Sequence, residues 1–66
     1  MYKLTQKTTV VEGKEYRVYG IRYSDAIFVE DVTTDRARIE GLIADCNKYS
    51  LDPIHLMNVI EDFLAE

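Results

Sequence analysis

The side chains with the most reactive chemistry in this chain of 66 residues are one thiol, Cys46, and one imidazole, His55. A thiol and an imidazole in contact can act as nucleophile and base. Cys46, however, lies on the apolar stripe predicted for its helix, where a thiol stays protonated and packs as a small hydrophobe. His55 falls at the start of a predicted helix, where the dipole disfavours a positive charge. We therefore predict structural roles for both and no catalytic residue, with a small Cys/His enzyme as an alternative.

Carboxylates and glycines give no stronger indication of a site. A metal ion held by His55 and Asp62 would join residues almost two helical turns apart, with no further His or Cys available to complete its coordination. Glu61 and Asp62 are adjacent, so a helix points their side chains about 100° apart. The three glycines occur singly, without the spacing of a phosphate-binding loop. We predict no metal site, no cofactor and no enzymatic activity.

Tyrosine is the residue type that stands out, with five in the chain. Alternation along residues 15–23 puts Tyr16 and Val18 on one face of a strand. The other face carries Arg17, Tyr19, Ile21 and Tyr23. Two helices can cover only one face of a small sheet, and the sequence leaves open which one.

The uncovered face is expected to combine aromatic rings with basic side chains. Such a surface is typical of contact with protein, or, as an alternative, of a basic sheet that stacks single-stranded nucleic acid. The predicted partner-binding residues are Tyr16, Arg17, Val18 and Tyr23.

The elements that must position these residues change type near Thr33 and Thr34. Before that point the composition and alternation are those of strands, over residues 2–11, 15–23 and 26–32. Gly13, within Glu12-Gly13-Lys14, and the pair Ser24-Asp25 supply two tight turns. Residues 1–32 are therefore predicted to form a three-stranded antiparallel β-meander.

Helical spacing begins near Thr33 and Thr34 and predicts a first helix over residues 33–48. Thr33 or Thr34 can cap this helix, and Asp35 suits the positive end of its dipole. The apolar positions form one stripe: Ile39, Leu42, Ile43, Cys46 and Tyr49. This stripe should lie on the sheet.

The start of a second helix, over residues 52–65, is the clearest local signal. Asp52 can cap it, Pro53 suits its first position, and Leu51 can pack on Leu56. Its apolar band is wider than one neighbour needs: Leu56, Met57, Val59, Ile60, Phe63 and Leu64. The sequence thus predicts one α+β domain over residues 1–66, a meander followed by two antiparallel helices packed on one face (βββαα).

Composition indicates that such a domain associates with another chain. Sixty-six residues are near the lower limit for a core without disulfides or metal, yet 47% of the residues are hydrophobic. This is more apolar surface than one small sheet and two helices hide, which favours a homodimer. The single cysteine forms no internal disulfide, and no segment has membrane-spanning length, so we expect a cytoplasmic protein without membrane contact.

The net charge of −4 is unevenly distributed. Residues 1–23 carry five basic and two acidic side chains, a balance of +3, and residues 24–66 carry three basic and ten acidic ones, a balance of −7. An acidic helical half repels phosphate, which disfavours nucleic acid and anionic membranes as its partners.

Several segments carry a resemblance to known families: Tyr19-Gly20-Ile21, residues 31–35, residues 51–56 and residues 59–64. Together they resemble a family of short uncharacterised proteins from Gram-positive Firmicutes, a domain of unknown function. The resemblance implies a bacterial protein and brings no activity or site residues with it.

A second resemblance is architectural. A strand followed by two helices is similar in order to the ribbon-helix-helix DNA-binding dimers, whose strand presents polar or basic side chains to the major groove. The strand here ends in Glu30 and Asp31, which phosphate would repel, and it has no basic side chain. A nucleic-acid-binding regulator is therefore only the alternative hypothesis. Our principal hypothesis is a non-catalytic protein–protein interaction or regulatory module that acts as a homodimer.

Overall fold

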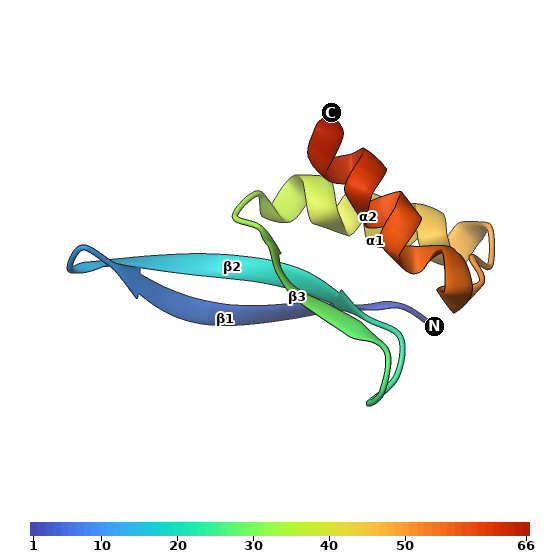
Figure 1. Cartoon of the computed structure of the whole chain (residues 1–66), viewed down its shortest axis with the longest axis horizontal. Helices are drawn as coiled ribbons and strands as arrows, with labels where there is room; N and C mark the ends of the chain where they lie inside the picture. The colour runs from blue at the N-terminus through green and yellow to red at the C-terminus, as the bar shows by residue number, and fades with distance from the viewer.

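The computed structural model describes all 66 residues and has two layers, a sheet and a pair of helices (Figure 1). The elements are β1 (Lys3–Val11), β2 (Lys14–Arg22), β3 (Phe28–Thr33), α1 (Arg36–Lys48), a 3₁₀ turn η1 (Pro53–His55) and α2 (Leu56–Ala65). The strands form one antiparallel sheet in the order β1-β2-β3, and both helices lie on the same side of it. The predicted α+β fold is confirmed.

The turn between β1 and β2 is the predicted tight reversal. Glu12 and Gly13 both have positive φ, 52° and 79°, as a two-residue type I′ turn requires. Val11 and Lys14 are the paired residues that flank it. The turn fixes the register along the whole length of both strands.

The connection between β2 and β3 is longer than the predicted two-residue turn at Ser24-Asp25. The backbone N–H groups of Tyr23 and Ser24 both donate to the carbonyl of Ile27, and Ile27 N–H donates back to Ser24. These bonds close a wider loop, so β3 begins at Phe28 rather than Ala26. Arg22 and Asp25 form an ion pair across it.

A bulge in β3 lies directly against Gly20. Between the pairs Ile21–Val29 and Tyr19–Thr33, β2 contributes only Gly20 while β3 contributes residues 30–32. A Cβ on Gly20 would lie 2.9 Å from Glu30 Cα and closer still to the Val29 carbonyl oxygen. A glycine in the interior of β2 is therefore explained by the close approach of the β3 backbone.

α1 begins at Arg36, three residues later than the predicted start at residue 33. Asp35, and neither Thr33 nor Thr34, is the N-cap: its carboxylate accepts a hydrogen bond of 3.1 Å from Arg38 N–H. A carboxylate cap also faces the positive end of the helix dipole, which favours it over a hydroxyl. Thr33 supports the cap by accepting a hydrogen bond from Asp35 N–H.

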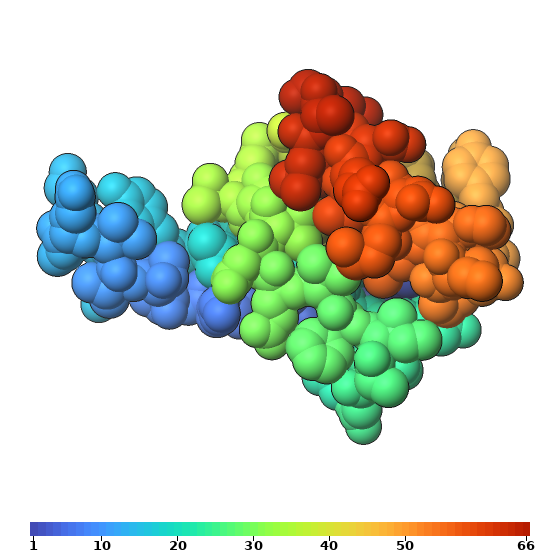
Figure 2. Space-filling model, in the orientation of Figure 1, coloured from blue at the N-terminus to red at the C-terminus, as the bar shows by residue number.

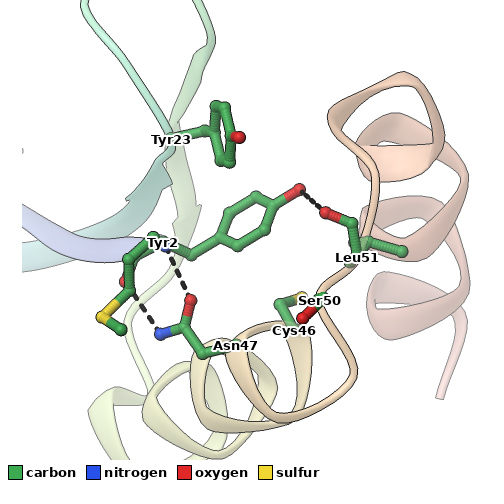
Figure 3. A pocket seen from close by; sticks show the side chains of 7 residues that line it. Tyr2, Tyr23, Cys46, Asn47, Ser50 and Leu51 are labelled. Carbon is green, nitrogen blue, oxygen red and sulfur yellow. Dashed lines mark hydrogen bonds between the residues drawn. The ribbon is translucent and has the colours of Figure 1, made fainter.

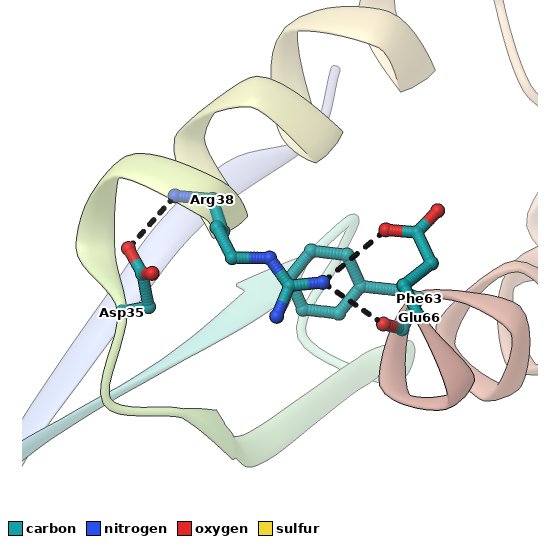
Figure 4. A network of polar contacts seen from close by, with 4 residues as sticks. All are labelled: Asp35, Arg38, Phe63 and Glu66. Carbon is teal, nitrogen blue, oxygen red and sulfur yellow. Dashed lines mark hydrogen bonds and ion pairs between the residues drawn. The ribbon is translucent and has the colours of Figure 1, made fainter.

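The second helix begins as predicted, but through a 3₁₀ turn. Asp52 accepts a hydrogen bond of 3.1 Å from Ile54 N–H, and Pro53 occupies the first position. The α-helical spacing starts only at Leu56. The C-terminal end of α2 returns to the start of α1, where the Arg38 guanidinium donates to the Phe63 carbonyl and to Glu66, both at 3.2 Å, and lies over the Phe63 ring (Figure 4).

The core lies between the sheet and the helices and contains ten buried residues: Tyr2, Tyr19, Ile21, Val32, Ile39, Ile43, Cys46, Leu56, Ile60 and Phe63. The covered face is therefore the one that carries Tyr19 and Ile21. Tyr49 was expected on the buried stripe of α1, but it is 70% exposed, because it is the C-cap residue at which the helix ends. No helix has both the length and the apolar character needed to cross a bilayer.

Candidate interaction surface

The part of the molecule with the fewest neighbours is the far end of the β1–β2 hairpin. β1 and β2 have nine residues each, whereas β3 has six and pairs with β2 only from Tyr19 to Arg22. Residues 7–18, which we call the hairpin arm, therefore continue as a two-stranded ribbon. The arm projects beyond the helices in Figure 1, and Figure 2 shows it in blue as a separate lobe.

The arm makes the molecule more extended than its size requires. The radius of gyration is 12.1 Å, against about 11 Å for a compact domain of this length. The accessible surface is 4803 Å², whereas a compact monomer of the same mass exposes about 4300 Å². The arm, which neither a helix nor a third strand covers, contributes to this excess.

Several arm side chains are apolar and exposed. Val10 is 63% exposed, Val11 52% and Tyr16 44%, and no residue of the arm is fully buried. An isolated two-stranded hairpin is at best marginally stable in water, because it has no third strand or helix to pack on. A partner that packs against the arm would therefore stabilise it.

Three of the four predicted partner-binding residues belong to this arm. Tyr16 and Val18 alternate with Tyr19 and so lie on the face of the sheet that the helices leave open. Arg17 lies on the opposite face of the same strand, beyond the reach of the helix layer, and is exposed.

Tyr23 lies elsewhere, beyond the end of β2 and away from the arm. Its ring packs against the ring of Tyr2, with centroids 5.0 Å apart, although the residue is 40% exposed. The structure therefore does not bring the four residues together into one patch.

The open face is more polar than the alternation of β2 alone indicates. Because β1 pairs with β2, its Lys and Thr side chains share that face: Lys3, Thr5, Lys7 and Thr9. The exposed Val11, Tyr16 and Phe28 and the half-buried Val18 supply the apolar part. The apolar surface is concentrated toward the arm and β3 rather than spread over the sheet.

Lys7 is held by the bulge of β3. Its ammonium lies 3.0 Å from Asp31 and 3.6 Å from Glu30, and the hydrogen bond to Asp31 raises the pKa of Lys7 above its ordinary value. Asp31 has the positive φ of 57° that the bulge imposes. This cation is therefore already paired within the chain.

A hollow of about 230 Å³ opens where the N-terminus meets the end of α1 (Figure 3). Tyr2 crosses it: its hydroxyl donates to the Leu51 carbonyl at 2.8 Å. The Asn47 amide accepts from Tyr2 N–H at 2.7 Å and donates to the Tyr2 carbonyl at 3.0 Å, as a neighbouring strand would. Burial raises the pKa of Tyr2, so its hydroxyl remains a proton donor.

Cys46 and His55 are not brought together into a site. Cys46 is only 4% exposed. Burial raises the pKa of its thiol, so the thiol stays protonated near neutral pH. His55 is exposed at the last position of the 3₁₀ turn and lines neither of the two hollows that Cys46 borders. Nor does any group of three or more His, Cys, Asp or Glu side chains have metal-binding geometry.

The residues that the sequence reasoning overlooked are Val10 and Val11 on the arm and Phe28 on β3. The available signal was length: a strand of six residues cannot accompany a hairpin of nine-residue strands to its tip. Alternation within each strand does not reveal which part of a hairpin lacks a third strand.

Comparison with known proteins identifies a family without indicating an activity. No curated protein and no solved structure matches the chain. The resemblance to ribbon-helix-helix proteins is not supported, and β3 lies within the intrachain sheet, hydrogen-bonded to β2. The sequence model of one family, described as a family of unknown function (DUF6514), matches residues 1–66, so the protein belongs to that family.

Proposed function

We propose that this protein is a non-catalytic protein–protein interaction module that acts as a homodimer, with the hairpin arm in its interface. The observation that carries the proposal is the arm itself, a two-stranded ribbon with Val10, Val11 and Tyr16 exposed and no element beside it. A partner that covers these side chains would remove their apolar surface from water.

The balance of surface and core supports self-association. Eleven large hydrophobic residues are exposed in the single chain, against ten in the core. A standard interface buries about 800 Å² on each partner, roughly one sixth of the 4803 Å² that this chain exposes. The protomer has enough uncovered apolar surface for such a contact.

The charges of the sheet favour protein over nucleic acid as the partner. Two of the five basic side chains of β1 and β2 are already paired with carboxylates, Lys7 with Glu30 and Asp31 and Arg22 with Asp25. Cations that are already neutralised by carboxylates gain less from phosphate and release fewer counterions.

The test is a double substitution on the arm, Tyr16→Ser with Val18→Ser, measured by sedimentation at concentrations up to the high micromolar range. We expect the dimer dissociation constant to rise by about tenfold or more, because two apolar side chains leave the interface. The fold should persist by circular dichroism, since Tyr16 is exposed and Val18 only half-buried.

A matched control is Tyr49→Ser, which removes an equally large ring that is 70% exposed on the helix side of the molecule. This variant should dimerise like the wild type. A wild-type chain that sediments as a monomer at high micromolar concentration would contradict the homodimer, and a double variant that dimerises normally would exclude the arm from its interface.

A further inference from the structure

We infer that the second copy adds to the arm as a neighbouring strand, through antiparallel pairing of β2 with β2 about a twofold axis at Tyr16. The inference rests on the proposed homodimer and specifies its geometry. The product is a four-stranded ribbon in the order β1-β2-β2-β1, built from two arms.

The backbone along one edge of β2 is free to make this pairing. On the β3 side of β2, Tyr23 N–H donates to Ile27, and the direction of backbone N–H and C=O groups alternates along a strand. Glu15 and Arg17 therefore direct their backbone groups to the same side, where β3 no longer accompanies β2. An axis at Tyr16 places these two residues opposite each other, so the free groups of both copies pair.

The side chains of this segment are complementary to themselves. With the axis at Tyr16, Glu15 of each copy lies opposite Arg17 of the other, and the two Tyr16 rings lie side by side. Opposed charges and aromatic pairs are the cross-strand contacts that stabilise antiparallel sheets. Neither Glu15 nor Arg17 forms an ion pair within its own chain, so both are available.

The other free edge of the sheet, along β1, lacks this complementarity. Its only charged residues are Lys3 and Lys7, so pairing of β1 with another β1 brings no carboxylate to either cation. Lysines on an edge strand are a common protection against such pairing. The arm thus has one edge that accepts a second copy and one that does not.

Charge reversal tests the pairing directly. The variants Glu15→Arg and Arg17→Glu each place like charges opposite one another twice, and each should weaken the dimer by about tenfold to thirtyfold. An equimolar mixture of the two variants should form a heterodimer, because each Arg of one chain then lies opposite a Glu of the other. The double variant E15R/R17E should dimerise like the wild type.

A disulfide provides a second measurement. Opposed residues that do not exchange backbone hydrogen bonds in an antiparallel pair have Cα atoms about 4.5 Å apart, within the range that a disulfide spans. With oxidised glutathione as the oxidant, Tyr16→Cys should give a covalent dimer, whereas Thr8→Cys, on β1 away from the axis, should not.

The outcomes separate the two proposals. A monomeric wild type would overturn the homodimer and this pairing together. A dimeric wild type whose single charge variants dimerise as tightly as it does, or whose mixed variants associate no more tightly than the single ones, would overturn the strand pairing alone.

Discussion

At the scale of single residues, Gly20 has the strictest requirement in the chain. The bulge of β3 crosses its α-carbon so closely that a methyl group would overlap the Val29 carbonyl and the Glu30 backbone. Both obstacles are main chain, which cannot rotate away as a side chain can. The position that joins the arm to the body of the sheet therefore accepts no side chain.

Gly20→Ala should lower the free energy of unfolding by about 3 kcal/mol, because the sheet must shift to make room for the new methyl group. Gly41→Ala is the matched control: a methyl group there would meet no atom within 4 Å, and alanine favours a helix interior. That variant should gain about 0.5–1 kcal/mol. Urea unfolding of both variants compares the two effects, and a harmless G20A would contradict the close approach.

At the scale of elements, the helices and the sheet are joined by a few specific contacts. Arg38 ties the start of α1 to the end of α2, and Asn47 ties the end of α1 to the first residues of the chain. The Asn47 amide supplies both the acceptor and the donor that the Tyr2 backbone would otherwise find in a strand. β1 is thereby anchored at the end opposite the arm.

Asn47→Ala should destabilise the domain by about 1–2 kcal/mol, because it removes both partners of the Tyr2 backbone. Amide exchange at Tyr2 should accelerate more than exchange in β2. Equal protection of the Tyr2 amide in N47A and wild type would argue against the anchor.

At the scale of the whole molecule, one small core supports a fold with a projecting arm. Cys46 and Tyr2 are buried in that core, and burial raises the pKa of both. An acid whose pKa is higher in the folded state binds its proton more tightly there. Its contribution to stability is complete below the ordinary pKa and is lost as the pH rises from the ordinary value to the folded value.

Stability should therefore fall in alkaline solution, beginning near pH 8.5 for the thiol and near pH 10 for the phenol, about the ordinary values of these groups. Thermal unfolding between about pH 7 and pH 10 measures this fall. Cys46→Ala should show a smaller alkaline decrease than the wild type, although it is less stable at neutral pH because of the lost packing. An identical pH dependence in both proteins would contradict the role of the thiol.

The sequence determined the element order, the α+β class and most of the core, because each depends on local signals. Asp52 and Pro53 mark a helix start by their own chemistry, and Gly13 marks a turn by its accessible φ. The six-residue apolar band predicted for the second helix contains the three buried residues of α2, Leu56, Ile60 and Phe63, although Met57 and Leu64 of the same band are exposed. The errors were local too: the wider loop between β2 and β3, the cap at Asp35, and Tyr49, where the helix ended before the stripe did.

Which face of the sheet is covered, and where the sheet ends, depends on tertiary contacts. Both faces of β2 carry aromatic and aliphatic side chains, so alternation fits either orientation; the contact of α1 with Tyr19 and Ile21 selects one. The arm exists because β3 departs from β2 at Tyr19, and that depends on the bulge and on the path into α1. These are relations between segments distant in sequence, which no local pattern of residues specifies.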